Sequence, residues 1–296
     1  MLIVPAIIAL FCAAAGVPCP VATDPTHAPG SAAPPPGGRL GGMRIVVCVK
    51  HVPDVQSDRT LDEEGRVVRG LDDVLNELDE NAVEAAVSLV EEHGGEVIAV
   101  TMGPEDAEDA VRRALQMGAD RGVHVVDDAL AGADVVSTAR VLAAAVRAVP
   151  EPVDLVVTGM ASLDGLTSML PAALAGLLDL PQLTLASEVT VTGAQVRVRR
   201  EIGAAVEVLE APLPALVSVT DQANEPRYPA FKAIRAARKK PVDTWQLTDL
   251  GIPAPEAATA VLSAQERPAR EQGRIVVDSG DGGRQLAAFL IDAKLV

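Results

Sequence analysis

Short apolar runs and amphipathic segments alternate along residues 44–178. The apolar runs predict strands at 44–49, 96–101, 122–126 and 153–157. The amphipathic segments predict helices at 76–93, 104–117 and 134–149, and an Ala/Leu-rich helix is expected after residue 168. In the first of these helices, Val83, Ala86, Val87 and Val90 lie on one face, and the glutamates lie on the other. The pattern predicts an α/β fold with a doubly wound, mostly parallel sheet covered on both faces.

A different pattern follows residue 187. Residues 188–201 and 206–209 alternate apolar and polar positions around a Thr192-Gly193-Ala194 turn, which predicts an antiparallel addition to the sheet. A further strand is expected at 214–220, and a small hairpin around Asp62 to Gly65. Residues 243–270 are Pro/Ala-rich, as in a linker or arm. The last helix, 284–294, carries Leu286, Phe289 and Leu290 on one face, and we expect that face to pack on the main domain or on another chain.

Residues 1–42 differ from the rest of the chain. Leu2 to Gly16 is apolar, like the hydrophobic part of a signal peptide, but no Lys or Arg precedes it. The Pro/Gly/Ala-rich stretch that follows buries too little apolar surface to become ordered. We expect a disordered or signal-like extension over 1–42, a main domain over 43–241 and a C-terminal arm and helix over 242–296. Met43 is the expected natural start, and the expected location is the cytoplasm.

Composition narrows the range of functions. Acidic residues outnumber basic ones, 41 to 25, and the formal net charge of −16 repels nucleic acid and anionic membrane surfaces. The three cysteines, including Cys48 in its apolar run, have no metal-binding or CxxC spacing, so no metal site is predicted. The four histidines stand in no motif with a Ser or Cys. That argues against a hydrolase and leaves no candidate catalytic residue.

The loop after the strand at 153–157 has the order strand, glycine, helix that phosphate sites use. It contains no Lys or Arg, so a phosphate would be held by backbone amides and by the hydroxyls of Ser162, Thr167 and Ser168. The alternative is an ordinary connection between a strand and a helix. Three other segments, 50–54, 76–79 and 102–103, are expected at the same carboxyl edge of the sheet, where such folds bind ligands. Their convergence favours a nucleotide site.

A basic segment, residues 224–240, stands out in this acidic chain. It has six basic residues in seventeen positions, and it also contains the only tyrosine, Tyr228, and one of three phenylalanines, Phe231. One interpretation is a solvated basic helix. The other is a docking segment with an apolar anchor and a charged rim, which scarce aromatic residues beside the basic cluster favour.

Several segments match a known family in their order and spacing. They include IVVCVKHVPD at 45–54, IAVTMGPEDAEDAVRRALQMGADRGVHV at 98–125, LPQLTLAS at 180–187 and NEPRYPAFKAIRAARKKP at 224–241. Through them residues 43–296 resemble the beta (small) subunit of bacterial-type electron transfer flavoprotein. The resemblance implies an adenine-nucleotide-binding, Rossmann-like fold over 43–241 and a C-terminal arm and helix that pack on an alpha subunit.

The resemblance also implies a function and a set of site residues. FAD is held mainly by the alpha subunit, AMP is bound structurally in the beta subunit, and residues 224–240 dock on acyl-CoA or other dehydrogenases. Electrons pass to electron transfer flavoprotein-quinone oxidoreductase or another acceptor, so this subunit is an electron carrier rather than an enzyme. The implied cofactor contacts are Cys48, Asn76, Leu78, Asp79, Met102, Met160, Ala161, Ser162, Asp164, Gly165, Thr167 and Ser168. The implied docking residues are Arg227, Tyr228, Phe231, Ile234, Lys239 and Lys240.

Residues 160–171 depart from the family's best-known pattern. Met160-Ala161 replaces a Lys-Gln pair, and Asp164 is kept while its acidic neighbours are not. Asp164 has two expected uses, accepting hydrogen bonds from ribose or adenine, or capping the following helix. Two alternatives stay open: a bifurcating-type subunit with a second FAD in place of AMP, and a stand-alone adenine-nucleotide-binding module.

Overall fold

The computed structural model describes residues 42–57, 60–70, 72–264, 268, 273 and 275–296. Apart from Gly42, the predicted extension over 1–42 lies outside the described residues. Contacts within the chain separate Met1–Gly42 from a second unit, Met43–Val296.

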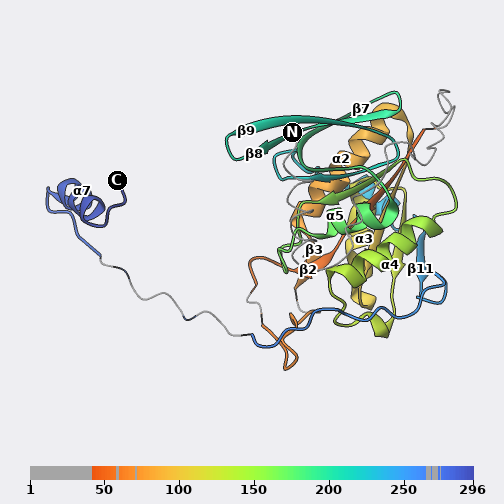
Figure 1. Cartoon of the computed structure of the whole chain (residues 1–296), viewed down its shortest axis with the longest axis horizontal. Coiled ribbons are helices and arrows are strands. Elements are labelled where there is room, and N and C mark those ends of the chain that lie inside the picture. The colour runs from red at the N-terminus through yellow and green to blue at the C-terminus, as the bar shows by residue number, and fades with distance from the viewer. Residues whose placement is uncertain (1–41, 58–59, 71, 265–267, 269–272, 274) are drawn as a thin grey trace, which may run out of the picture. The chain divides into compact units, whose positions relative to one another are not determined.

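The described residues form a nine-stranded sheet in the order β11-β5-β4-β1-β6-β10-β7-β8-β9 (Figure 1). The strands are β1 (Met43–Cys48), β4 (Gly95–Met102), β5 (Arg121–Val125), β6 (Leu155–Gly159), β7 (Gln182–Thr192), β8 (Gln195–Ile202), β9 (Ala205–Pro212), β10 (Ala215–Val219) and β11 (Val242–Trp245). Neighbours from β11 to β7 are parallel. Strand β8 pairs antiparallel with β7 on one side and with β9 on the other. The prediction of a doubly wound, mostly parallel sheet with an antiparallel addition is confirmed.

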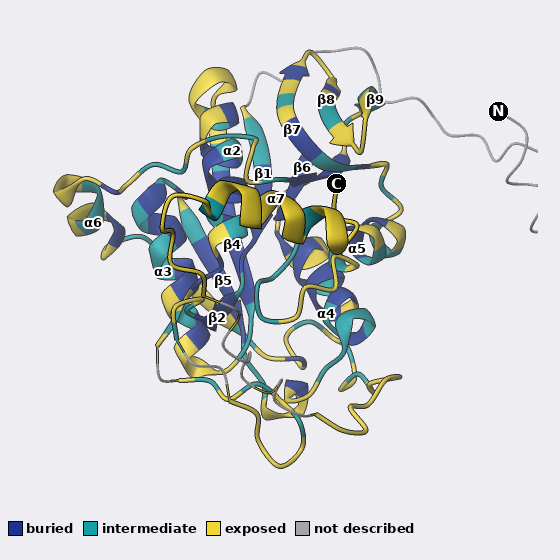
Figure 2. Cartoon of the chain, turned by 90° about the vertical axis from the view of Figure 1, so that its left-hand side faces the viewer, coloured by how far each residue is buried: buried dark blue, intermediate teal, exposed yellow. Residues whose placement is uncertain are grey.

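Helices cover both faces of the parallel part. The helices of the described residues are α2 (Glu77–His93), α3 (Glu108–Met117), α4 (Val135–Ala148), α5 (Leu170–Leu178), α6 (Phe231–Ala237) and α7 (Gly282–Asp292), with the 3-10 turns η1 (Glu105–Ala107) and η2 (Asp128–Leu130). The cover of the sheet comes from α2 to α5. One aliphatic cluster joins α2 and α3 to one face of the sheet, and a second joins α4 and α5 to the other. Figure 2 shows the central strands as buried and β9 as largely exposed. The core is therefore two aliphatic layers around a central sheet.

Strand β1 shows why the central strands are continuous apolar runs. It pairs with β4 on one side and β6 on the other, so every side chain points into one of the two covered faces. Ile45 and Val47 enter the cluster beneath α2, while Val46 and Cys48 enter the cluster beneath α4. Cys48 is 5% exposed, which confirms it as a small core residue.

Some local predictions change in the structure. The predicted hairpin around Asp62 to Gly65 is reduced to one antiparallel bridge, between Leu61 and Val67. The chain before and after it forms a small separate sheet of β2 (His51–Pro53) and β3 (Asp73–Leu75). Strand β11 was not predicted: it falls where the sequence indicated an arm, yet it pairs in parallel with β5 from Val242 to Trp245. Its sequence, VDTW, does not alternate regularly, and its place in the sheet comes from pairing alone.

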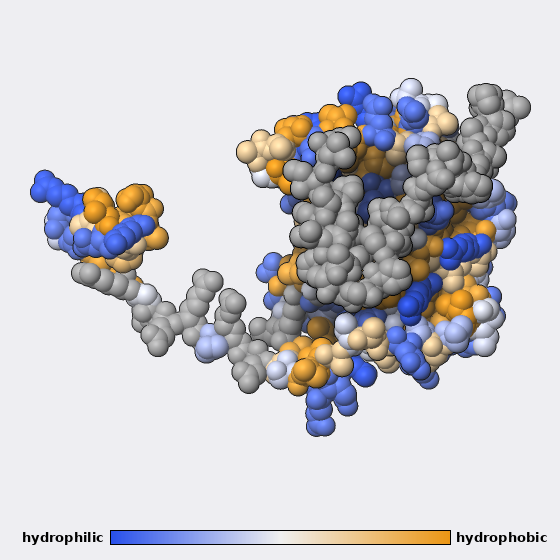
Figure 3. Space-filling model, in the orientation of Figure 1, coloured by the Kyte–Doolittle hydropathy of each residue, from blue (hydrophilic) through white to orange (hydrophobic). Residues whose placement is uncertain are grey.

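The last predicted helix is present as α7. None of its residues is buried, and Leu286, Phe289 and Ile291 are each more than half exposed. Figure 3 shows the resulting hydrophobic surface on this helix. The predicted apolar face therefore has no cover within the described part of the chain.

Candidate functional site

The strand order has a switch point between β1 and β6, where open α/β sheets bind ligands, and we call the carboxyl edge of the sheet at this point the crevice. From β1 the chain leads to α2 on one face of the sheet, while from β6 it leads to α5 on the other. Two loops that leave adjacent parallel strands in opposite directions open a gap at the carboxyl ends of those strands. The Gly159 loop, residues 160–169, and the start of α2 meet there. This is the edge at which the sequence placed a nucleotide site.

Asn76 joins the segments that form this crevice. Its side chain donates to the Ala161 carbonyl oxygen at 2.9 Å and accepts from the Leu163 amide at 3.0 Å. Its own amide donates to the Lys50 carbonyl oxygen at 2.9 Å. The residue is fully buried, so these bonds do not compete with water. Asn76 and Ala161, two of the predicted contacts, are thus brought together by a direct hydrogen bond.

Asp79 lies at the base of the crevice and is 6% exposed. Its carboxylate accepts the Lys50 amide at 2.9 Å. Burial raises the pKa of Asp79 to about 7, although hydrogen bonds from Asn76 and from the Lys50 and Gly159 amides partly offset that rise. Burial, with a smaller contribution from Asp79, raises the pKa of the neighbouring Cys48 thiol to about 12. Cys48 therefore stays a neutral thiol and offers packing rather than nucleophilic chemistry.

Gly159 allows α2 to lie directly on the end of β6. A Cβ at this position would stand 2.5 Å from Asp79 Oδ1 and 2.7 Å from the Leu78 carbonyl oxygen. No side chain fits in that space, so the glycine is required by close approach of the two backbones. Leu78 and Asp79 are consequently held against Gly159 at the end of β6.

Asp164 binds two cationic side chains, Lys50, which the sequence placed at this edge of the sheet without a partner, and Arg69, which it did not place there. Lys50 Nζ lies 2.9 Å from Oδ1 and 2.8 Å from Oδ2, and Arg69 Nη2 binds Oδ2. The Asp164 side chain is only 3% exposed. Burial raises its pKa, but the charge of Lys50 and the hydrogen bonds from Lys50, Arg69 and Ser162 outweigh burial and lower the pKa to about 2. Asp164 is therefore ionised and paired at neutral pH.

These contacts correct one expected role of Asp164. Helix α5 begins after Met169 without a hydrogen bond from a capping side chain, so Asp164 does not cap it. The Gly159 loop itself has no Lys or Arg, yet Lys50 brings a positive charge to it from the end of β1. With 43% of its side chain exposed, Lys50 also faces solvent. The sequence placed residues 50–54 at this edge, but it gave no sign that Lys50 binds Asp164.

The outer part of the Gly159 loop is exposed and tightly turned. Leu166 and Ser168 both have φ of 51°, in the left-handed region that few side chains adopt, and the Leu166 amide donates to the Ser162 carbonyl oxygen at 2.8 Å. Gly165, Thr167 and Ser168 are exposed, and Met160 and Ser162 are half-buried. Left-handed residues in a loop can turn neighbouring amides toward one side, as in anion-binding loops. Amides, exposed hydroxyls and the Lys50 ammonium can together bind a phosphate.

Met102 lies at the same edge, at the end of β4 on the other side of β1. It is half-buried and packs on the cluster beneath α4.

His124 lies in β5, within the strand predicted at 122–126, and its Nε2 lies 3.2 Å from the Gly103 carbonyl oxygen.

The docking segment, residues 224–240, contains the short helix α6 beside α3 (Figure 2). Tyr228 and Phe231 are 86% and 81% exposed, and Lys239 is also exposed, while Ile234 is half-buried. The Arg113 guanidinium lies 5.6 Å from the centre of the Tyr228 ring, within the range of a cation–π contact. Two large aromatic side chains thus stand in solvent next to basic residues.

Two predicted docking residues have partners within the chain. Lys240 Nζ donates to the carbonyl oxygens of Leu115 at 3.2 Å and Ala119 at 2.5 Å, so it caps the end of α3. Burial lowers the pKa of Lys240, with a smaller opposing effect from Asp120. Arg227 binds Glu84 and Glu91 of α2. Glu84 was expected on the solvent side of its helix, but it is 9% exposed and binds Arg227 instead.

The described part of the chain contains no group of three or more His, Cys, Asp or Glu residues that could hold a metal ion. Among the same residues, no helix has both the length and the apolar character needed to cross a bilayer.

Comparison with known proteins identifies the family. Residues 65–250 match the model of the electron transfer flavoprotein domain. The chain is 40% identical over 269 residues to an electron transfer flavoprotein subunit beta of Mycobacterium tuberculosis, covering 85% of this chain and 99% of that protein. It is 39% identical over 242 residues to the Mus musculus subunit beta, covering 79% and 92%. It is 35% identical over 257 residues to the caffeyl-CoA reductase-Etf complex subunit CarD of Acetobacterium woodii, covering 84% and 97%. The chain therefore belongs to the electron transfer flavoprotein family, among its beta subunits.

Proposed function

We propose that this chain is the beta subunit of a heterodimeric electron transfer flavoprotein. Its alpha partner holds most of the FAD, which accepts electrons from acyl-CoA or other dehydrogenases and passes them to a quinone oxidoreductase or another acceptor. The observation that carries this proposal is Phe231, which is 81% exposed at the start of α6 in the basic docking segment. Exposing a large apolar side chain to water gives a solvated basic helix no benefit, whereas at a docking surface the same side chain is buried against the partner.

AMP is the proposed ligand of the crevice between β1 and β6. The exposed hydroxyls of Thr167 and Ser168, the turned amides around them and the Lys50 ammonium fit a phosphate. Asp164 is neutralised by Lys50 and Arg69, so it would not repel that phosphate. Asn76 and Asp79 hold the crevice in shape rather than presenting free donors. These residues fit the phosphate of a nucleotide, and the proposal of adenine and of a structural role follows the resemblance to the family.

The proposed roles of this chain's own residues involve no bond-making chemistry. The docking segment binds and orients the dehydrogenase, and the crevice residues hold the domain's edge in place. Bound FAD supplies the electron acceptance and donation. The free, buried thiol of Cys48 agrees with the proposed cytoplasmic location, where thiols remain reduced.

Co-expression with an alpha subunit tests the proposal directly. We expect a yellow complex that contains one FAD and one AMP per heterodimer, measured by absorbance and by chromatography of the released nucleotides. A stable, colourless heterodimer would contradict the proposal. Two FAD and no AMP would instead support the alternative in which a second FAD occupies the crevice. Calorimetry with AMP on the isolated chain tests the stand-alone module, because such a module needs no partner to bind tightly.

Replacing Phe231 by alanine is expected to slow reduction of the complex by its dehydrogenase about tenfold, as loss of an apolar anchor costs at least about 1.4 kcal/mol. FAD content and melting temperature should not change, because an exposed side chain contributes little to folding. Stopped-flow reduction at several dehydrogenase concentrations measures the effect. Phe231→Leu, which keeps an apolar anchor, should recover most of the rate. A matching loss of flavin in Phe231→Ala would show that the residue is structural.

A further inference from the structure

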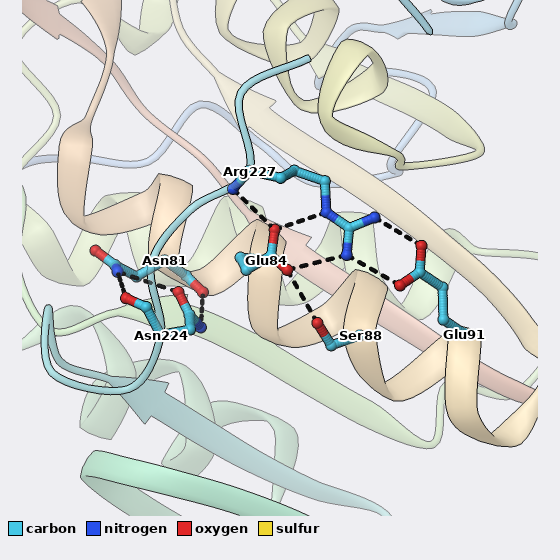
Figure 4. A network of polar contacts seen from close by, with 6 residues as sticks. All are labelled: Asn81, Glu84, Ser88, Glu91, Asn224 and Arg227. Atoms are coloured by element: carbon cyan, nitrogen blue, oxygen red, sulfur yellow. Dashed lines mark hydrogen bonds and ion pairs between the residues drawn. The ribbon is translucent and has the colours of Figure 1, made fainter. Parts of the chain in front are cut away.

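Helix α2 carries a polar stripe that faces the docking segment. Its members, Asn81, Glu84, Ser88 and Glu91, are spaced by three, four and three residues, so they lie on one side of the helix (Figure 4). Asn81 and Glu84 are 5% and 9% exposed. Polar side chains this deeply buried need partners, and the docking segment supplies them.

Arg227 makes the densest set of contacts with the stripe. Its amide and its Nε donate to Glu84 Oε2 at 3.1 and 2.7 Å, and its Nη2 donates to Glu84 Oε1 at 2.9 Å. The same guanidinium binds both oxygens of Glu91, at 2.6 and 3.0 Å. Ser88 adds a hydrogen bond to Glu84 Oε1 at 3.0 Å. Glu84 therefore holds both the backbone and the side chain of one docking residue.

The electrostatics of this pair agree with the geometry. Burial alone raises the pKa of Glu84, but hydrogen bonds from Arg227 and Ser88 outweigh it, and the pKa lies below its ordinary value. The hydrogen bonds that Arg227 donates to Glu91 and Glu84 raise its pKa. Both groups stay charged at neutral pH, and a buried carboxylate that loses its partner carries a large desolvation cost.

A second contact fixes the beginning of the segment. Asn81 Nδ2 donates to the Asn224 carbonyl oxygen at 2.9 Å, and Asn224 Nδ2 donates back to the Asn81 carbonyl oxygen at 3.0 Å. Asn224 and Arg227 are thus attached to successive turns of α2. Pro226 and Pro229, on either side of Arg227 and Tyr228, further limit the backbone. The chain reaches Phe231 four residues after its attachment at Arg227.

We propose that Glu84 is a positioning residue for docking: by holding Arg227 on α2, it fixes the path of the segment that presents Tyr228 and Phe231 to the dehydrogenase. Ordering the segment before the encounter removes the conformational entropy that docking would otherwise have to overcome. The inference rests on the proposed docking function of residues 224–240. It assigns Glu84 no contact with the dehydrogenase or with the flavin.

Three glutamate-to-glutamine changes on α2 test the inference, because they alter charge equally at different depths. Glu84→Gln removes the carboxylate that binds the Arg227 amide. Glu91→Gln removes the second ion pair of Arg227, whose carboxylate is 61% exposed. Glu92→Gln is the control, because the side chain of this neighbouring residue is 74% exposed. Hydrogen–deuterium exchange on the full chain follows the Arg227 amide. We expect its exchange to be at least about tenfold faster in Glu84→Gln, less affected in Glu91→Gln and unchanged in Glu92→Gln.

The heterodimer gives the second readout. In Glu84→Gln we expect the KM for the reducing dehydrogenase to rise about tenfold while kcat and FAD content stay close to those of the unmodified complex. If Glu84→Gln does not fold, Asn224→Ala weakens the neutral attachment without leaving an unpaired charge. It removes the hydrogen bond from Asn224 Nδ2 to the Asn81 carbonyl oxygen and keeps the one that Asn81 donates to the backbone of residue 224. This variant should raise the exchange rate and the KM in the same direction. The exchange measurement needs no dehydrogenase, so the positioning role can be judged even if no dehydrogenase reduces the complex.

Two results would overturn the inference. One is an unchanged exchange rate at Arg227 in Glu84→Gln, which would show that the carboxylate does not hold the segment. The other is faster exchange with an unchanged KM for a dehydrogenase that reduces the unmodified complex, which would show that docking does not depend on the order of the segment.

Discussion

Gly159→Ala is expected to lower the free energy of unfolding by about 3 kcal/mol or more, the upper part of the range for overpacking a tight site. The new methyl group would lie 2.5 Å from Asp79 Oδ1, 2.7 Å from the Leu78 carbonyl oxygen and 2.8 Å from the Leu78 carbonyl carbon. Two of these atoms are backbone, so no side-chain rotation relieves the overlap. Relief requires α2 to move away from the end of β6, and that movement opens the crevice on which we propose AMP binds.

Chemical denaturation measures this effect as a shift of the midpoint at constant slope. Gly176→Ala is the matched control, because Gly176 lies within α5 and no atom stands within 4 Å of a Cβ built there. In a helix, that change should stabilise the chain by about 0.5–1 kcal/mol. Equal stability of Gly159→Ala and the unmodified chain would mean that α2 does not pack on β6 as closely as the structure shows. AMP content should fall in Gly159→Ala and stay unchanged in Gly176→Ala.

Asp79→Asn is expected to change the pH dependence of stability. Burial raises the pKa of Asp79 from 3.8 to about 7, so between these values the folded state binds a proton that the unfolded state does not. The contribution of Asp79 to stability is therefore greatest at low pH and is lost as pH rises from about 4 to about 7. One pKa unit corresponds to about 1.4 kcal/mol, so the whole change amounts to about 4 kcal/mol.

The measurement is the difference in unfolding free energy between Asp79→Asn and the unmodified chain at pH 5, 6, 7 and 8. We expect the unfolding free energy of the asparagine variant, relative to that of the unmodified chain, to increase as pH rises toward 7 and to stay constant above pH 7. Carboxylates with lowered pKa, such as Asp164, titrate at lower pH and cancel in this difference. Glu77→Gln, in the same turn of α2 but exposed, controls for the change in net charge. A difference that does not vary with pH would place the pKa of Asp79 near its ordinary value.

Elements defined by local pattern were predicted well. The helix expected at 76–93 is α2, Glu77–His93, and the helix expected at 134–149 is α4, whose start is capped by Asp134, with its side chain accepting the Ser137 amide at 2.8 Å. Both segments have a continuous apolar face, and α4 also has a capping side chain; these features act between near neighbours. Strand β11 was missed because four residues with exposed polar positions carry no periodic signal, and only pairing with β5 makes them a strand.

In the candidate site, too, the sequence predicted the local features and missed the contacts between distant residues. The sequence located the carboxyl edge of the sheet, because each strand end and glycine loop can be read locally. It did not pair Asp164 with Lys50, since the two are 114 residues apart, nor Arg227 with Glu84, since they are 143 apart. Such pairs depend on which loops a strand order brings together, and hydrophobic periodicity says nothing about that order.

By itself, the sequence determined the alternation of strands and helices, the aliphatic core, the acidic charge, the position of the basic segment that we propose for docking, and membership of the family. Each follows from residue type and spacing along the chain. The tertiary structure alone decided that Asp164 is neutralised by two cations, that Lys240 caps α3, and that Arg227 is attached to α2 through Glu84. Folding removed these groups from water and brought distant ones within hydrogen-bonding distance. Burial and proximity, rather than residue type, therefore set their charge states and their roles.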